Sequence, residues 1–146
     1  FRRVLFRSQA RQLGISDKVR LIGGNGSNSP KLGTLAGAAA DGLIVGSPWF
    51  VGKPDPINTK FVTAFKARYD SAPDQFAAQA YDTLFIVAEA INRAGSTDGD
   101  KLREALLKTE HNGVMGPFRF TPGRDPASTE GIVVLQMTGG AFGLLP

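Results

Sequence analysis

The sequence contains no cysteine, and histidine occurs only once, at position 111. Without cysteine the chain can form neither disulfide bonds nor thiolate metal sites, and a single histidine excludes metal sites built on a histidine pair. No run of apolar residues approaches the roughly 20 that a helix needs to cross a bilayer. The carboxylates show no pairing that is readable as a general acid and base. We therefore expect no enzyme active site, no metal and no other cofactor.

The excess of positive charge is confined to the start of the chain. The 146 residues include 17 basic and 13 acidic side chains, for a net charge of +4. Arg2, Arg3 and Arg7 account for most of the difference, since without them 14 basic residues face 13 acidic ones. No basic stripe with interleaved aromatic residues remains, which is the pattern that nucleic-acid binding favours. We expect no nucleic-acid partner.

The other bulk properties are those of a soluble globular protein of about one domain: 42% of the residues are hydrophobic and 21% are charged. The chain starts without methionine and without the charged-then-apolar pattern of a secretory leader. We interpret it as a piece of a longer protein, and we regard residues 1–7 as a candidate for a foreign lead.

Residues 75–94 form the longest segment without glycine or proline, and we predict a helix there. Its polar residues follow one stripe at helical spacing: Gln75, Gln79, Asp82, Glu89 and Arg93. The remaining arc is apolar and too wide for a surface helix, so it should be covered on most sides. Gly95 is predicted to end the helix in the left-handed conformation. Glu89 and Arg93 are one turn apart and can pair.

The amino-terminal third predicts a strand, a helix and a second strand, which is typical of a parallel αβ arrangement. A helix should end at Gly14. The expected elements are a strand at 18–22, a glycine-rich loop at 23–30, a helix at 30–39 rich in small residues, and a strand at 42–46. The segment SPWFVGKPDP at 47–56 has three prolines and a glycine, so it is predicted to be a connector between two regions.

The remaining elements alternate between helical and β patterns. We predict helices at 56–69 and 98–108, a strand at 116–120, a turn-rich connector at 121–129, and a strand at 131–137 whose hairpin turn at 138–141 leads into 142–145. Asp74 should cap the helix at 75–94.

The glycine loop after the first strand is the main candidate binding segment. Gly24 and Gly26 suggest a dinucleotide fingerprint, but position 29 is serine where the third glycine belongs, and Asp41 precedes a strand instead of ending one. The loop can be a tight turn or a ligand contact. Since ligands bind beyond the carboxyl ends of strands in open α/β sheets, the best-placed polar groups are those of Asn25, Ser27 and Asn28.

Three other residues have two interpretations each. His111 is expected in a solvated loop, and a catalytic role is the less favoured alternative because no nucleophile or paired carboxylate accompanies it. Asp82 is expected to have a structural role, with a place in a cleft or at a hinge as the alternative. Trp49 can be a packing aromatic or can line an opening.

Four segments together carry a family resemblance: GGNGSNSPKL; AGAAADGLIVGSPWF; FVTAFKARYDSAPDQFAAQAYDTLFIVAEAINRAG; and GVMGPFRF followed by GRDP. In this order they resemble the branched-chain amino-acid type substrate-binding proteins of ABC importers. The resemblance covers residues 8 to 142, and it implies the carboxyl-terminal part of a longer chain. The implied fold is α/β, namely the periplasmic-binding-protein type I fold, partial, with pieces of two αβ lobes.

The resemblance also implies a division of the chain between the lobes. Residues 8–50 would belong to the second lobe, residues 51–128 to the first lobe, and residues 129–146 would supply the last strands of the second lobe. The connector at 47–56 would be a hinge crossing, and the chain would cross back near 120–128.

The implied function is the capture of a small polar ligand, an amino acid or a related metabolite, by hinge closure and its delivery to a membrane permease. The implied location is periplasmic or extracytoplasmic. The family's acidic side chain at the glycine loop corresponds to Asn25, which brings no charge, and its aromatic wall corresponds to Phe76. Asn25, Ser27 and Phe76 are therefore the candidate ligand-binding residues. Alternatives are a sensory ectodomain of the same fold and a Rossmann-like nucleotide-binding enzyme domain.

Overall fold

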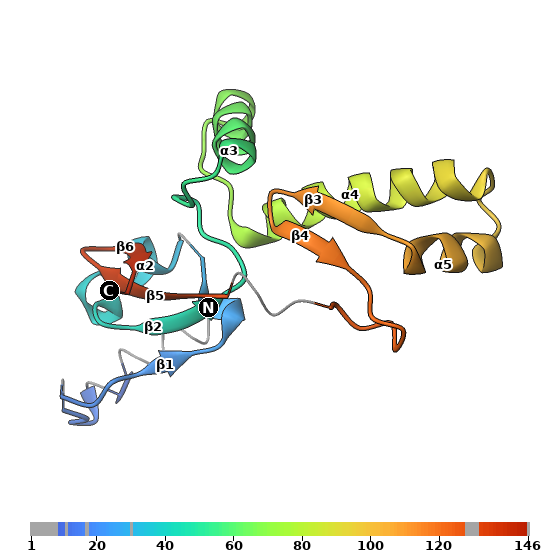
Figure 1. Ribbon diagram of the computed structural model, residues 1–146. Coiled ribbons are helices and arrows are strands. Elements are labelled where there is room, and N and C mark those ends of the chain that lie inside the picture. Colours follow the sequence, from blue (N-terminus) through green and yellow to red (C-terminus); the bar gives the residue numbers. More distant parts are fainter. Residues whose placement is uncertain (1–8, 11, 17, 30, 128–131, 146) are drawn as a thin grey trace. The chain divides into compact units, whose positions relative to one another are not determined.

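The computed structural model describes residues 9–145 except residues 11, 17, 30 and 128–131. The contacts divide the chain into two compact units (Figure 1). We call Phe1–Phe50 together with Ile132–Pro146 the sheet unit, and Val51–Gly131 the helical unit. The chain therefore leaves the sheet unit after Phe50 and returns to it at Ile132. The expected foreign lead at residues 1–7 lies outside the described residues.

The sheet unit contains a four-stranded mixed sheet. Its strands are β1 (Ile22–Gly23), β2 (Ile44–Ser47), β5 (Val133–Thr138) and β6 (Ala141–Leu144), in the order β1-β2-β5-β6. The pair β1 and β2 is parallel, and the chain joins them through a 3₁₀ turn, η1 (Asn25–Ser27), the helix α2 (Lys31–Ala36) and a second 3₁₀ turn, η2 (Gly37–Ala40). The predicted parallel αβ arrangement is confirmed. The strands β5 and β6 add to it in antiparallel fashion.

The core of the sheet unit lies on one face of the sheet, where α2 packs. Val45 and Leu135 are register partners and are both buried. The buried core consists of Leu32, Ala40, Leu43, Val45, Leu135 and Met137. Gly33 lets α2 approach the sheet, because a Cβ at this position would lie 1.8 Å from the carbonyl oxygen of Gly140. The tight packing predicted from the small residues of this helix is present.

The opposite face of the same sheet is apolar and open. Side chains alternate along a strand, so the neighbours of the buried residues point to this other face. Ile22 is 78% exposed, Ile132 is 61% exposed and Val134 is 45% exposed. All-parallel sheets are usually covered on both faces, whereas a sheet with antiparallel strands, as here, can leave one face uncovered.

The β5–β6 connection is the predicted two-residue hairpin turn. Thr138 pairs with Ala141, and the intervening Gly139 and Gly140 have φ values of +57° and +83°. Positive φ at both central residues is the type I′ geometry that matches the twist of a hairpin. Glycine adopts it without the steric cost that other residues incur.

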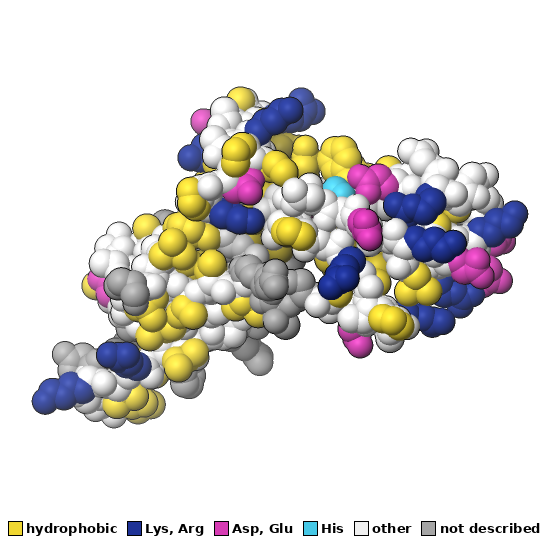
Figure 2. Space-filling model, viewed as in Figure 1, with side chains coloured by type: hydrophobic (Ala, Val, Ile, Leu, Met, Phe, Trp, Pro, Cys, Tyr) yellow, Lys and Arg dark blue, Asp and Glu magenta, His cyan; other side chains and the backbone are white. Residues whose placement is uncertain are grey.

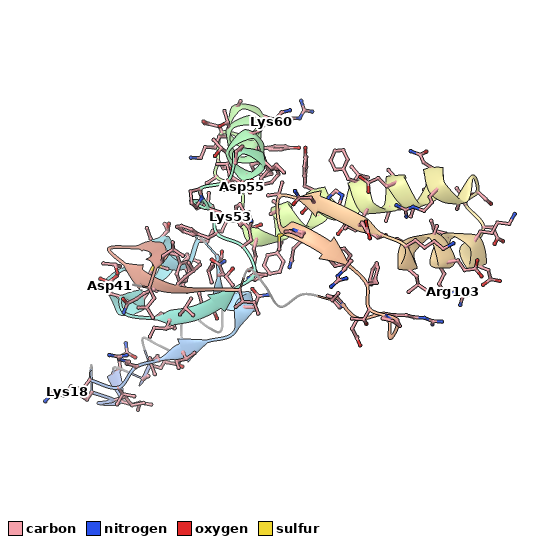
Figure 3. The ribbon with its side chains drawn as sticks, in the orientation of Figure 1. Lys18, Asp41, Lys53, Asp55, Lys60 and Arg103 are labelled. Carbon is pink, nitrogen blue, oxygen red and sulfur yellow. The ribbon has the colours of Figure 1, made fainter. Side chains whose placement is uncertain are left out.

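The helical unit contains three helices and a two-stranded hairpin: α3 (Pro56–Tyr69), α4 (Gln75–Ala94), α5 (Gly99–Leu107), β3 (Glu110–Gly113) and β4 (Gly116–Arg119). Aspartates precede all three helices, at positions 55, 74 and 98, and each carboxylate accepts a hydrogen bond from backbone N–H groups of the first turn. Figure 3 shows Asp55 where α3 begins, with Lys60 farther along the helix. Gly95 ends α4 with φ of +60°, as predicted.

Several expected boundaries are wrong. The strand expected at 18–22 is reduced to Ile22–Gly23, because only these residues pair with β2. The helix expected at 30–39 ends at Ala36, since Gly37 has φ of +51° and a 3₁₀ turn follows.

The helix-capping Gly14 is confirmed, with φ of +82° after a helical turn in which the Leu13 N–H donates to the Gln9 carbonyl. The expected end of the connector at 128–129 and the start of the strand at Gly131 lie outside the described residues.

Candidate functional site

The glycine loop follows the carboxyl end of β1, as its sequence predicts. Asn25 and Ser27 belong to one 3₁₀ turn, in which the Ser27 N–H donates to the Gly24 carbonyl at 2.8 Å. Asn25 is exposed and Ser27 is half-buried. A Cβ at Gly23 would lie 2.9 Å from the Ser27 hydroxyl and 3.2 Å from Val45 Cγ1, so glycine makes room for the close approach of this turn to β1. The loop thus holds two polar side chains beyond the end of a strand, where a small ligand can reach them.

Asn28 differs from the other polar residues of the loop because its side chain points back into the fold. Its Nδ2 donates a hydrogen bond of 2.6 Å to the hydroxyl of Ser47, at the end of β2. Ser47 is fully buried. Asn28 thereby fixes the loop to the neighbouring strand, and Asn25 and Ser27 remain as the candidates for ligand contact.

The nucleotide interpretation of the loop gains no support from its surroundings. Asp41, the only acidic residue at a suitable distance, is exposed and lies in the turn before β2 (Figure 3). In the dinucleotide fold the acidic residue stands at the end of the second strand, where it binds the ribose.

The structure favours the packing interpretation of Trp49. Its side chain is 3% exposed, and its backbone N–H and carbonyl both bond to the Ser47 hydroxyl, at 3.3 and 2.6 Å. It therefore does not line an open surface.

Phe76 is the second residue of α4 and lies in the helical unit, whereas Asn25 and Ser27 lie in the sheet unit. Its side chain is 52% exposed. The Asp74 cap fixes the start of the helix through a 2.9 Å bond from the Ala77 N–H, so the position of Phe76 on the first turn is well determined. An exposed ring on a capped helical turn offers apolar contact to a ligand.

Asp82 is structural, as expected. It is 4% exposed, and its two carboxylate oxygens accept hydrogen bonds from the backbone N–H groups of Val114 (2.9 Å) and Met115 (2.7 Å). These two residues form the turn between β3 and β4. A Cβ at Gly113 would lie 2.4 Å from the carboxylate, so only glycine lets the hairpin come this close to α4. Asp82 therefore ties the hairpin to the helix.

The expected loop position of His111 is wrong. His111 lies in β3 opposite Phe118, and its side chain is only 10% exposed. The ring is held between two carboxylates of α4, with Nδ1 3.3 Å from Glu89 Oε1 and Nε2 3.8 Å from Asp82 Oδ1. Figure 2 shows the histidine (cyan) with an acidic side chain (magenta) beside it. The sequence places Asp82 and Glu89 seven residues apart on one helical stripe, but no pattern in it predicts that the strand β3, with His111, packs against this stripe.

The predicted pairing of Glu89 with Arg93 is also wrong. Glu89 faces His111, and the Arg93 guanidinium donates instead to the carbonyl of Ala105 in α5, at 2.7 Å. Arg93 thus joins two helices.

A groove between α3 and α4 has an aromatic wall that the sequence did not reveal as one surface. Its volume is about 640 Å³. The ring centroids of Phe61 and Tyr81 are 4.9 Å apart, and those of Phe65 and Tyr69 are 4.6 Å apart. Figure 2 shows hydrophobic side chains (yellow) gathered between α3 and the histidine. The lining of the groove is mostly apolar, and its charged residues are Lys60 and Arg68.

The described part of the chain has neither a metal site nor a membrane-spanning helix. It holds no group of three or more acidic, histidine or cysteine side chains that could bind a metal ion. None of its helices combines the length and apolar character needed to cross a membrane.

Comparison with known proteins gives a consistent result. The model of a family described as periplasmic binding protein matches residues 3–141. A curated relative, the leucine-, isoleucine-, valine-, threonine- and alanine-binding protein of Pseudomonas aeruginosa, is 32% identical over 98 residues. That match covers 67% of this chain and 26% of the relative.

Solved structures match nearly the whole chain. The leucine-binding protein LivK of Thermotoga maritima is 28% identical with a TM-score of 0.84, covering 98% of this chain and 40% of its own. LivJ of Streptococcus pneumoniae, solved with isoleucine, is 27% identical with a TM-score of 0.82, covering 95% and 39%. A substrate-binding protein of Desulfitobacterium hafniense, solved with leucine, is 30% identical with a TM-score of 0.77, covering 97% and 39%. The chain thus spans about two fifths of the length of these structures.

Proposed function

The chain belongs to the periplasmic binding protein family, and on this premise we propose that it is the carboxyl-terminal part of a solute-binding protein of an ABC importer. Its fold is the type I fold of that family, in part. The observation that carries the proposal is the structural match of nearly the whole chain. In each matched protein, a binding protein for leucine or solved with leucine or isoleucine, the match covers less than half of the length. The relatives are binding proteins, so no covalent chemistry is proposed.

The sheet unit is proposed to be a piece of the second lobe, and the helical unit a piece of the first lobe. The chain passes between the units after Phe50, within the proline-rich connector, and again before Ile132. A connector that carries three prolines is not held by a continuous helix or sheet, so two lobes joined in this way can move as bodies. Binding then stabilises the closed arrangement, because the ligand contacts both lobes only in that state.

The proposed ligand is a small polar molecule, an amino acid or a related metabolite. In this proposal Asn25 and Ser27 contact its polar groups and Phe76 its apolar part. The amide of Asn25 can accept a hydrogen bond from an ammonium group without contributing a charge. Because a charge-assisted bond is roughly twice as strong as a neutral one, this position should contribute less affinity than a carboxylate would.

Calorimetry on the longer protein that carries this chain tests the proposal, with L-leucine and L-isoleucine as probes. Phe76→Ala should weaken binding about 10-fold to 100-fold, because burial of a large apolar side chain contributes about 1.5–3 kcal/mol. Leu84→Ala is the matched control, since Leu84 lies two turns along α4 from Phe76 and is not among the proposed ligand contacts. It should leave the affinity unchanged.

Two results would contradict the proposal. One is the absence of heat with every amino acid tried, and the other is equal affinity of the Phe76→Ala and Leu84→Ala proteins. Saturable binding of NAD or ATP would instead support the nucleotide-binding alternative. A sensory ectodomain would share the ligand site, and a membrane-spanning helix in the longer protein would distinguish it from an importer component.

A further inference from the structure

Ser47, the last residue of β2, uses all three hydrogen-bonding positions of its hydroxyl. The hydroxyl accepts from Asn28 Nδ2 at 2.6 Å and from the Trp49 N–H at 3.3 Å, and it donates to the Trp49 carbonyl at 2.6 Å. A serine hydroxyl offers one donor and two acceptor positions, so it is fully satisfied here. The tight turn before Asn28 does not require such a hydroxyl, and neither does the packing of Trp49. The bonds of Ser47 to both Asn28 and Trp49 therefore call for another explanation.

Asn28 and Trp49, the two hydrogen-bond partners of the Ser47 hydroxyl, belong to segments with different proposed roles. Asn28 directly follows the turn Asn25–Ser27, and its N–H donates to the Asn25 carbonyl at 3.0 Å. Trp49 is the third residue of the connector at 47–56. The Ser47 hydroxyl therefore links the candidate ligand loop (residues 25–28) to the start of the connector within the sheet unit.

Burial makes this link sensitive to geometry. Ser47 is 0% exposed and Trp49 is 3% exposed. In such surroundings successive hydrogen bonds polarise one another, and an amide or carbonyl that loses its partner cannot readily replace it with water. An arrangement that turns the Trp49 carbonyl away would leave the Ser47 proton without its acceptor and would therefore weaken the hydrogen bond from Asn28.

We propose that Ser47 is a positioning residue that couples the ligand loop to the connector. This inference rests on the proposed function of the connector as a hinge. A ligand held by Asn25 and Ser27 fixes the turn, which directs the Asn28 amide at Ser47, and Ser47 in turn orients the Trp49 carbonyl. Coupling of this kind is reciprocal, so the position of the connector also affects the affinity of the loop for its ligand.

The first test needs no ligand. The longer protein is labelled with 5-fluorotryptophan, and the ¹⁹F resonance of Trp49 is identified by its loss in Trp49→Phe. Asn28→Ala and Ser47→Ala should both shift this resonance, whereas Ser47→Thr, which keeps the hydroxyl, should leave it near its original position. Ser71→Ala, at an exposed serine of the loop before α4, is the matched control and should have no effect. An unshifted Trp49 resonance in Asn28→Ala would overturn the inference.

The second test adds L-leucine as the probe. Ser47→Ala should weaken binding about 5-fold to 10-fold, as expected when the ligand loop loses its partly buried hydrogen bond from Asn28 to Ser47, and should abolish the ligand-induced shift of the Trp49 resonance. Wild-type affinity together with a full Trp49 response in Ser47→Ala would contradict the coupling. Absence of leucine binding by the unmodified protein would exclude leucine as the ligand instead, and the ligand-free comparison would still decide on the link.

Discussion

At the scale of single residues, buried polar groups in this chain hold turns in place. The Asp82 carboxylate satisfies two backbone N–H groups of the β3–β4 turn, and the Nδ2 of Asn58 donates to the carbonyls of Val51 and Lys53, at 3.1 and 3.0 Å. A turn buried against a helix has no water to satisfy its backbone groups, so a side chain must supply the partner. This requirement explains why a buried aspartate stands at position 82 of α4.

Asp82→Ala should lower the free energy of unfolding by about 2–3 kcal/mol, because it leaves the buried N–H of Val114 and the partly buried N–H of Met115 without an acceptor. Asp82→Asn should cost less, since its amide oxygen can still accept one of the two bonds. Urea unfolding followed by circular dichroism measures both values. Asp41→Asn, at an exposed aspartate, is the control and should change the stability by less than about 0.5 kcal/mol. An equally small effect of Asp82→Ala would show that the hairpin does not depend on this carboxylate.

At the scale of elements, glycine decides how closely segments pack. Three close approaches depend on it: Gly33 of α2 on the β5–β6 turn, Gly113 of β3 on Asp82, and Gly23 of β1 on Ser27. The sequence marked residues 30–39 as a tightly packing helix through their small side chains, and the sheet unit confirms this. No sequence pattern predicted the strand β3, because its residues Glu-His-Asn-Gly show neither alternation of apolar and polar side chains nor β-branched residues.

Gly33→Ala should destabilise the chain by about 1–3 kcal/mol, because the new methyl group would meet the Gly140 carbonyl and α2 would have to shift. Gly99→Ala is a matched control in α5, where a Cβ meets nothing within 4 Å. That change should be neutral or stabilising by up to about 1 kcal/mol, since alanine favours a helix more than glycine does. Comparison of the two unfolding midpoints decides the prediction, and equal midpoints would contradict it.

At the scale of the whole molecule, each unit presents an apolar surface. In the sheet unit it is the open face with Ile22, Ile132 and Val134. In the helical unit it is the exposed part of α4, where Leu84 is 68% and Phe85 is 43% exposed, beside the aromatic groove. Contiguous apolar surface of this kind is typical of regions that meet other protein. This fits a chain that spans about two fifths of the structures it resembles.

The isolated chain should therefore self-associate, and it should bind L-leucine no more tightly than millimolar, because a large part of the proposed cleft is absent. Analytical ultracentrifugation and calorimetry measure the two properties. Joint replacement of Leu84 and Val134 by lysine should reduce association, while replacement of the exposed Thr63 and Thr34 by lysine should not. A monodisperse monomer that binds leucine at micromolar concentration would show that the chain is sufficient by itself.

The amino-acid sequence was enough to predict the long helices, the Asp74 cap, the Gly139–Gly140 hairpin turn and the family resemblance, whereas the caps at Asp55 and Asp98 were found in the structure. These features depend on neighbours along the chain: side-chain periodicity, capping hydrogen bonds and the φ values that glycine allows. Three features became visible in the folded chain: the place of His111 between two carboxylates, the hydrogen bonds of Asp82 to the hairpin, and the link through Ser47. Each of these contacts joins residues that are far apart in sequence. Such contacts depend on how the chain folds, and they leave no periodic pattern in the sequence.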